Sequence, residues 1–305
     1  MTRMRIPLII VLALPASLWA WTAPVPLAGV NSNLAEDWAP FPSFDGLSLY
    51  FSRVRSDEFY YGRMYEAWRG QPSGPFTIVR QLDELNKPGT HVLCPWVSPD
   101  NLRMYYYTEH DREGWKLRVS ERPSTSAPWP QGVEISELNV LGSQLQAPKL
   151  TPDELTVFFD AYEMPGGQGG YDIWMATRPD IDSPFGSVMN LGEINSGAAD
   201  THQFVSTDGL ELYFVSDRNG SFQIFRATRD SAHNAFGNVE HLSFLDTPGG
   251  HSLFPAPSSD GMAIYFTRET ASGRFTRDIY VSYIPEPATI VLLTFGEALL
   301  RRKLR

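Results

Sequence analysis

The chain has 305 residues, of which 42% are apolar and 13% aromatic, and a formal net charge of −10 at pH 7. This length and composition are enough for one large domain or two ordinary ones with a buried core. Much of the positive charge lies at the two ends, so the body between them is more acidic still and would repel a phosphate backbone, which excludes nucleic acid as an expected partner. The single cysteine, Cys94, excludes an intramolecular disulfide and a cysteine-rich zinc site, and its apolar neighbours predict a buried, unreactive thiol.

Residues 1–20 have the pattern of a secretory signal peptide. A basic start with Arg3 and Arg5 precedes a short apolar run over 6–14, and small residues follow up to Ala20. The apolar run is much shorter than the roughly 20 residues that a membrane-spanning helix needs. We therefore expect cleavage after Ala20 and export of the remaining chain.

Five repeats fill the body of the chain, residues 21–283. Each contains a turn with an aspartate, followed by an apolar, aromatic-rich strand. In the fourth repeat the turn at 206–209 leads into alternating apolar residues, a tight turn at 217–220 and a second apolar strand, which is the pattern of a β-hairpin. The turn aspartates recur at spacings of 52 to 55 residues and are Asp45, Asp100, Asp153, Asp208 and Asp260.

Each repeat is expected to contain four strands. One precedes the turn aspartate, one follows it, and a third follows the hairpin turn, as at 171–176 and 278–281. A fourth is expected to end in an asparagine or aspartate. The expected fourth strands are 82–86, 135–139, 191–195 and 242–246. Four strands per repeat, at a period slightly above 50 residues, predict an all-β fold, a five-bladed β-propeller, because stacked blades bury the faces that a single blade leaves exposed.

The fifth repeat ends near Tyr283 without a fourth strand. A matching segment is present at the other end of the chain, since 21–32 (WTAPVPLAGVNS) aligns with 185–196 (FGSVMNLGEINS) at the end of the third repeat. We therefore predict that residues from about Thr22 to Asn31 complete the last blade. Such a clasp joins the two ends of the ring and leaves no open sheet edge between the first and last blades.

The repeats resemble those of the TolB-type, WD-repeat-like propeller family. The resemblance covers 21–283 and is strongest over 206–229, where the sequence reads STDGLELYFVSDRNGSFQIFRATR. The second and third repeats depart from it, because Asn101 and Glu154 replace the glycine that follows the turn aspartate. The resemblance implies that the turn serine, aspartate and glycine are structural, so they mark the fold and not a functional site.

The C-terminal segment, 284–305, joins a proline-rich start, an apolar run over 288–300 interrupted by Glu297, and a basic end. This order resembles the PEP-CTERM sorting signal of exosortase substrates. The resemblance implies cleavage by an exosortase-type membrane protease near the prolines, transient membrane contact through the tail, and delivery to the cell surface or extracellular matrix. The apolar run is too short for a permanent anchor, and the terminal arginines would halt export at the cytoplasmic face. The residues that carry the resemblance are Pro285, Glu286, Pro287, Arg301 and Arg302.

Polar residues recur six to nine positions before the turn aspartates, where the innermost strands are expected to begin. We predict that they converge at one mouth of the axial channel. The candidates are Glu36, Asp37, His91, Gln144, Asp200, His202 and His251. Carboxylates and imidazoles around a channel could hold a divalent cation, act as acid/base pairs, or only solvate the opening. The metal stays unknown at this point, and no other cofactor is expected.

The sequence favours a non-catalytic role, in which a rigid propeller is presented to a polysaccharide or an envelope protein. The alternative is a carbohydrate-active hydrolase, because five-bladed propellers include glycoside hydrolases with carboxylates on their innermost strands, where Glu36, Asp37 and Asp200 are expected. Such an enzyme needs two carboxylates about 5–9.5 Å apart, and they must be open to solvent. A pure scaffold, the third alternative, would expose an apolar patch on one face.

Overall fold

The computed structural model of the chain describes residues 21–55, 61–110, 114–141, 144–270 and 276–284. The predicted leader at 1–20 and the predicted sorting residues Pro285, Glu286, Pro287, Arg301 and Arg302 lie outside the described residues. Across the described ranges, no helix has both the length and the apolar character needed to cross a membrane. The compact unit that carries the fold runs over Ala23–Ser282.

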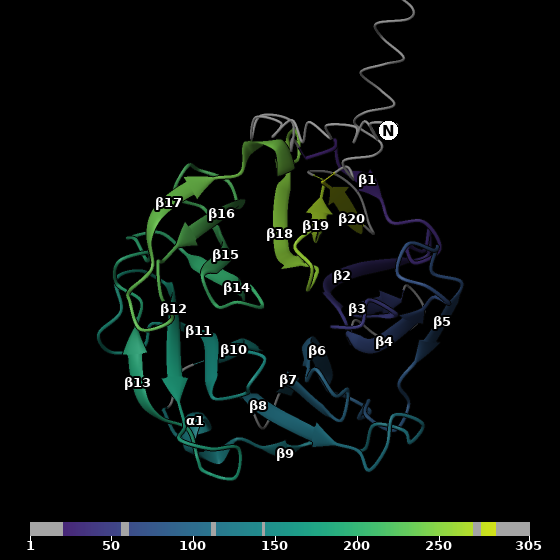
Figure 1. Ribbon diagram of the computed structural model, residues 1–305, viewed down its shortest axis with the longest axis horizontal. Coiled ribbons are helices and arrows are strands. Elements are labelled where there is room, and N and C mark those ends of the chain that lie inside the picture. The colour runs from purple at the N-terminus through teal and green to yellow at the C-terminus, as the bar shows by residue number, and fades with distance from the viewer. Residues whose placement is uncertain (1–20, 56–60, 111–113, 142–143, 271–275, 285–305) are drawn as a thin grey trace, which may run out of the picture. The chain divides into compact units, whose positions relative to one another are not determined.

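Five four-stranded sheets surround a central axis, as Figure 1 shows, and this confirms the predicted five-bladed β-propeller. Successive innermost strands contact one another around the ring, and the last contacts the first. From inside to outside, the blades are β2 (Ala35–Pro42), β3 (Ser48–Arg55), β4 (Arg63–Trp68) and β5 (Ile78–Gln81); β6 (His91–Val97), β7 (Arg103–His110), β8 (Gly114–Glu121) and β9 (Val133–Glu134); β10 (Gln144–Leu150), β11 (Thr156–Tyr162), β12 (Tyr171–Thr177) and β13 (Gly186–Asn190); β14 (Asp200–Val205), β15 (Glu211–Ser216), β16 (Gln223–Thr228) and β17 (Gly237–His241); and β18 (His251–Pro257), β19 (Ala263–Glu269), β20 (Arg277–Tyr283) and β1 (Val25–Pro26).

The N-terminal segment completes the fifth blade, as predicted. Strand β1 pairs antiparallel with β20, and Val25 lies opposite Val281. The amide side chain of Asn31 extends this pairing, because its Nδ2 donates to the carbonyl of Ile279 at 2.8 Å and its Oδ1 accepts from the N–H of Ile279 at 3.0 Å. The first strand of the chain and the last therefore lie in one sheet and close the ring.

The fourth strands of the other blades lie earlier in each repeat than predicted. The predicted segments hold turns or short helices instead, among them α1 (Ser136–Asn139) and the 3₁₀ helix η2 (Ser243–Leu245). Asn195 shows why the prediction was wrong: its side chain accepts from the N–H of Ile173 at 3.0 Å and donates to the carbonyl of Ile173 at 2.9 Å. One amide side chain thus imitates the pairing of a strand residue. The same pairing joins Asn86 to Met64 and Asn139 to Leu117.

A β-bulge interrupts every innermost strand at the same position, six residues before the turn aspartate. The residue there has a φ between 49° and 55° in all five blades. In three blades the N–H of this residue bonds to the preceding blade: Cys94 donates to Ser52 Oγ and Ala39 to Thr267 Oγ1, both at 3.2 Å, and His202 donates to Asp160. The bulge therefore links neighbouring blades near the axis. Cys94 itself is buried and free, as predicted, and burial raises the pKa of its thiol to about 12. The bulge residues are Ala39, Cys94, Ala147, His202 and Phe254.

Candidate functional site

Side chains fill the propeller axis, so the space between the inner ribbons of Figure 1 is occupied. The buried ring of Phe41 lies 6.1 Å from that of Trp96 and 5.8 Å from that of Phe204. Nearer the start of the inner strands, the His202 ring stacks on Phe254 at 3.6 Å. A hollow of about 10 Å³ beside Phe41 leaves room for about one water. The described channel is therefore blocked by two layers of rings.

The two inner-strand aspartates are held in buried ion pairs. Asp37 Oδ1 lies 2.5 Å from Arg53 Nε, and Asp200 Oδ1 lies 2.5 Å from Arg218 Nη2. Both carboxylates are fully buried, and each also accepts the backbone N–H of a nearby serine. Burial raises the pKa of Asp37, and its bonds to Arg53 oppose that rise. These pairs brace the first and fourth blades, and neither carboxylate is open to solvent in the way that the hydrolase alternative requires.

Two of the predicted histidines link neighbouring blades. His91 Nδ1 accepts from the N–H of Gly62 at 2.9 Å, and His251 Nδ1 accepts from the N–H of Phe222 at 3.2 Å. In both cases the donor directly precedes the third strand of the preceding blade. An accepting Nδ1 carries no proton, so both rings are fixed with that nitrogen as an acceptor.

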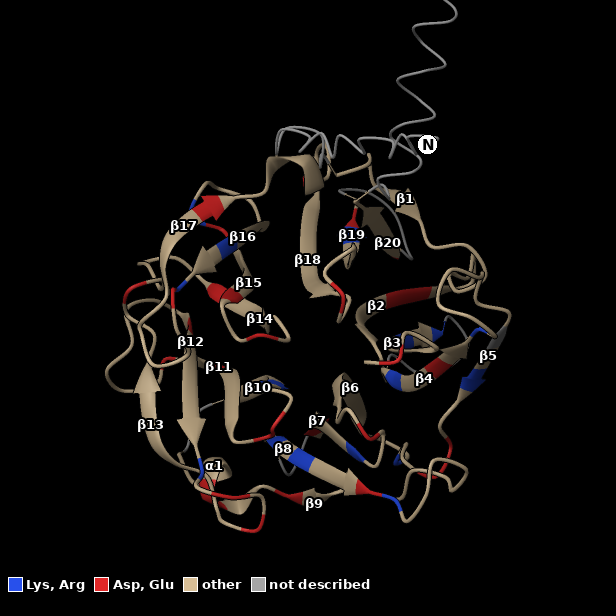
Figure 2. Ribbon diagram, in the orientation of Figure 1, with Lys and Arg blue, Asp and Glu red and all other residues tan. Residues whose placement is uncertain are grey.

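The other predicted mouth residues are arranged less uniformly. Gln144 is exposed and accepts from the hydroxyl of Tyr171 at 3.2 Å, while Glu36 is partly exposed in the acidic segment of β2, red in Figure 2. His202 lies deeper, at the bulge, where burial lowers the pKa of its imidazole to about 3 and keeps it neutral. In the part of the chain that the structure describes, no three His, Cys, Asp or Glu side chains are grouped so as to hold a metal ion.

Sequence reasoning missed two buried charged groups close to the axis. Asp160 on β11 accepts from Gln146 Nε2 at 2.9 Å and from the hydroxyl of Thr201, and burial raises the pKa of its carboxyl to about 7. Lys149 donates to the carbonyl of Pro95 at 2.5 Å, and burial lowers the pKa of its ammonium to about 8. Together they link the second, third and fourth blades. Comparing the repeats position by position would have found the lysine, which stands where other blades carry Phe41, Trp96 and Phe204.

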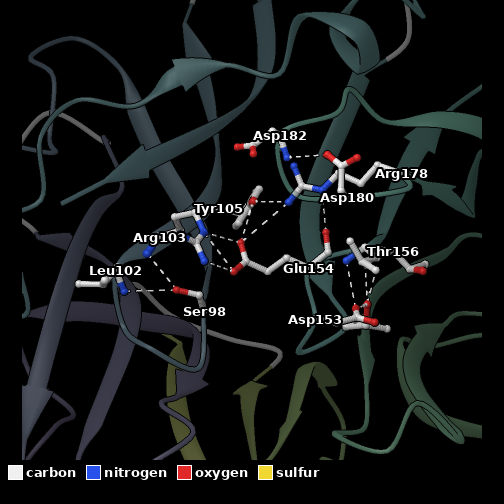
Figure 3. Close-up of polar contacts among 12 residues, drawn as sticks. Ser98, Leu102, Arg103, Tyr105, Asp153, Glu154, Thr156, Arg178, Asp180 and Asp182 are labelled. Carbon is white, nitrogen blue, oxygen red and sulfur yellow. Dashed lines mark hydrogen bonds and ion pairs between the residues drawn. The ribbon is translucent and has the colours of Figure 1, made fainter. Parts of the chain in front are cut away.

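A polar network joins the second and third blades at the turn that follows β10 (Figure 3). Glu154 occupies the turn-glycine position with a φ of +61° and is buried. Its carboxylate accepts two bonds from Arg103, at 2.6 and 2.8 Å, and one from the hydroxyl of Tyr105 at 2.9 Å. Arg178 lies 4.0 Å away and donates to the same hydroxyl at 3.0 Å. The glutamate therefore fills this junction with a charged, bidentate contact.

An arginine after the third strand closes this turn in four blades, a feature that sequence reasoning also missed. Its Nε donates to the carbonyl of the turn residue at 2.6 to 2.9 Å, and its guanidinium lies 4.0 to 4.5 Å from the centre of an aromatic ring seven residues later. The recurring seven-residue spacing is the signal that could have revealed it. The arginine, turn residue and ring are Arg69, Gly46 and Phe76; Arg122, Asn101 and Trp129; Arg178, Glu154 and Phe185; and Arg229, Gly209 and Phe236.

The corresponding junction between the third and fourth blades is hollow. Gly209 stands there in place of a turn residue with a side chain, and a hollow of about 540 Å³ lies beside it. A second hollow, of about 340 Å³, shares Met175 and Arg229 with the first. A third, of about 370 Å³, lies between the fourth and fifth blades beside Gly261. The larger described hollows thus lie between blades and not along the axis.

The fold has counterparts among solved structures. No family model and no curated protein sequence matches the chain. Similar structures include a putative TolB from Agrobacterium tumefaciens (19% identity, TM-score 0.48, 82% of this chain and 91% of that one) and an α-L-arabinofuranosidase from Podospora anserina (13%, 0.56, 88% and 98%). A family 117 glycoside hydrolase from Zobellia galactanivorans is also similar (14%, 0.55, 86% and 88%). The chain is a five-bladed β-propeller. At these identities the likeness establishes the fold alone, since one propeller fold serves many functions.

Proposed function

We propose that the propeller is a non-catalytic binding module that is exported to the cell surface or extracellular matrix and binds a polysaccharide. The observation that carries this proposal is the state of the inner carboxylates. Asp37 and Asp200 are fully buried and paired with Arg53 and Arg218, so the positions at which a propeller hydrolase would need open acids are engaged in structural contacts. Hollows of ligand size lie between the blades instead.

Export is supported by the sequence patterns at the two ends. The leader at 1–20 and the sorting pattern from Pro285 onward together match a chain that is exported and then released by an exosortase-type protease. The test is to produce the chain in a host with such a protease and to measure the mass of the mature protein. We expect a product that ends near Pro285, and we expect Glu286→Ala to leave the tail attached. Retention of the tail in the parent chain as well would overturn this part of the proposal.

The binding role is tested by a thermal-shift screen of the full chain against neutral and acidic oligosaccharides, combined with an assay for newly released reducing ends. A ligand that binds only the folded state stabilises it by about 2.7 kcal/mol at one hundred times its Kd. We expect at least one glycan to raise the Tm while no reducing ends are released. Release of reducing ends that is lost in both Asp37→Asn and Asp200→Asn would instead establish the hydrolase alternative.

An envelope protein is the other partner class that the sequence left open. It becomes the better candidate if every glycan in the screen leaves the Tm unchanged. The hollow beside Gly209 favours a glycan because hydroxyl and carboxylate groups line part of it, among them those of Thr156, Thr177 and Asp153.

A further inference from the structure

We propose that the hollow between the third and fourth blades binds the carboxylate of a uronate residue in an acidic polysaccharide, with Arg229 as the cation that receives it. We call this hollow the Gly209 groove. The inference rests on the proposed binding function and names its site and ligand class. The groove is lined by Thr156, Met175, Thr177, Gly209, Arg229 and His233, among others.

The junction between the second and third blades contains a carboxylate at the position that corresponds to Gly209. In the turn that follows β10, the side chain of Glu154 enters the junction and its carboxylate meets Arg103 and Tyr105, with Arg178 at 4.0 Å. In the turn that follows β14, Gly209 adopts the same left-handed conformation, with a φ of +73°, but has no side chain. A Cβ built on Gly209 would lie 3.5 Å from Arg229 Nη2. A ligand carboxylate that enters the groove beside Gly209 would therefore lie close to Arg229, as the Glu154 carboxylate lies close to Arg178 in the neighbouring junction.

Arg229 lacks an internal partner that two of its counterparts have. Arg178 Nη2 donates to the hydroxyl of Tyr105 at 3.0 Å, and Arg69 Nη2 donates to that of Tyr265 at 3.5 Å. The corresponding residue for Arg229 is Phe158, whose buried ring has no hydroxyl.

The bonds of Arg229 within the described residues run from Nε to the carbonyl of Gly209 at 2.7 Å and from Nη1 to that of Asn234 at 3.4 Å. Neither of these bonds uses Nη2, so this nitrogen is available to donate to a ligand. Partial burial lowers the pKa of this guanidinium, and a carboxylate bound at Nη2 would oppose that shift.

The remaining lining favours a sugar acid over a simple polyanion. Asp153 and Asp208 border the groove, and each is fixed in its turn by a hydroxyl and a backbone N–H that bond to Oδ1. These negative charges would repel a ligand that carries only anionic groups. Their remaining oxygens suit sugar hydroxyls as donors, and Thr156 and Thr177 add hydroxyls of their own. A uronate can meet both requirements of the groove, because its carboxylate can accept from Arg229 while its hydroxyls donate to Asp153 and Asp208.

The junction between the fourth and fifth blades provides a contrast. It also has a glycine, Gly261, at the turn position and a hollow of about 370 Å³. Its preceding blade contributes Glu211 at the position of Arg103, and the described part of the fifth blade has no arginine after β20. This junction is therefore open but acidic, which makes Gly261 a matched control position.

The test measures the affinity of the full chain for tetragalacturonate and for its methyl ester by titration calorimetry. We expect the acid to bind at least tenfold more tightly than the ester, because a hydrogen bond to a charged partner contributes that much. Gly209→Glu should abolish this preference, since the new side chain carries its own carboxylate into the groove. Glu154 adopts a φ of +61° at the same turn position, so the fold tolerates a glutamate there although the left-handed backbone costs some stability. Gly261→Glu should leave the preference intact.

A second variant tests whether the result for Gly209→Glu comes from a local distortion by the new glutamate. Arg229→Gln should also reduce the preference for the acid at least tenfold, while the circular dichroism of both variants stays that of the parent. Equal binding of acid and ester, or a preference that survives in Gly209→Glu, would overturn the inference. Binding of tetraglutamate with the same dependence on Gly209 would overturn the sugar class.

These outcomes are separable from those of the proposed function. If neither galacturonate probe binds while another glycan raises the Tm, the binding module stands and the assignment of the Gly209 groove fails. Release of reducing ends would instead overturn the non-catalytic role, whatever the groove binds.

Discussion

The junctions on the two sides of the third blade have the same backbone frame but differ at their turn ends. Between the second and third blades, Glu154 joins Arg103 and Tyr105 at the turns. Between the third and fourth blades the link lies near the axis, where Asp160 accepts from Thr201, and the turn end is hollow. The frame is set by backbone features that recur in every blade, whereas the side chain of Glu154 fills one junction and Gly209 leaves the other hollow.

The hollow junction can stay open without loss of the fold because other contacts hold its two blades together. The arginine clamp on the turn carbonyl is present on both sides, at Arg178 and at Arg229. The inner bulges and the aromatic rings on the axis supply the remaining contact between blades. A blade that lacks a turn-end network therefore keeps enough contacts with its neighbours to stay in the ring.

The largest effect is expected from Glu154→Ala. This change leaves Arg103 and Arg178 at a buried junction without their carboxylate, and breaking a buried ion pair in this way costs about 3 kcal/mol or more. Urea unfolding measures the loss. Glu84→Ala, at an exposed glutamate, is the control and should change the free energy of unfolding by about 0.5 kcal/mol or less. A similar loss for both variants would show that the network does not stabilise the junction.

A smaller effect is expected from removing the clamp on each side. Arg229→Gln loses the bond to the carbonyl of Gly209 and the contact with Phe236, which together contribute about 1–2 kcal/mol. Arg178→Gln should cost more, because Arg178 also bonds to Tyr105 and faces Glu154. Unfolding free energies of the two variants under the same conditions test the order. Equal losses would mean that the two junctions do not differ as described.

A pH dependence is expected at the inner link. Burial raises the pKa of Asp160 from the ordinary 3.8 to about 7, so between these values the folded state binds more protons than the unfolded state and stability falls as the pH rises. The change Asp160→Asn removes this pH-dependent loss of stability, and the asparagine oxygen can still accept from Gln146 and Thr201. Its Tm advantage over the parent should therefore grow from pH 4 to pH 7 and then level off. Lys149 and Cys94, which face the carboxyl, and His202, whose N–H bonds to it, remain in both proteins. An advantage that shrinks across this range would contradict the assignment.

The repeat pattern was sufficient to predict the fold. The turn aspartates gave the number of blades, and the alignment of 21–32 with 185–196 gave the strand that closes the ring. The fourth strands were misplaced because an asparagine such as Asn195 imitates strand pairing with its side chain, which a hydrophobic pattern does not reveal.

The site was harder to predict, because spacing along the chain does not show what a side chain meets in a neighbouring strand or blade. The sequence placed Asp37 and Asp200 on the innermost strands, where they lie, but gave no sign of their pairing with Arg53 and Arg218. The replacement of the turn glycine by Glu154 was visible, yet its meaning depends on Arg103 and Tyr105 of the preceding blade. The hollow at Gly209 is likewise defined by contacts across a junction.

The most direct test of the difference between the junctions follows the methionine methyl groups by NMR while tetragalacturonate is added. Met175 lines both hollows at the open junction, and Met189 lines the smaller one, whereas Met104 is buried in the second blade. We expect the Met175 signal, assigned with Met175→Leu, to shift on titration, and we expect the shift to be absent in Gly209→Glu and present in Gly261→Glu. An unchanged Met175 signal under conditions where the oligomer binds would place the ligand outside the open junction and contradict the assignment of the Gly209 groove.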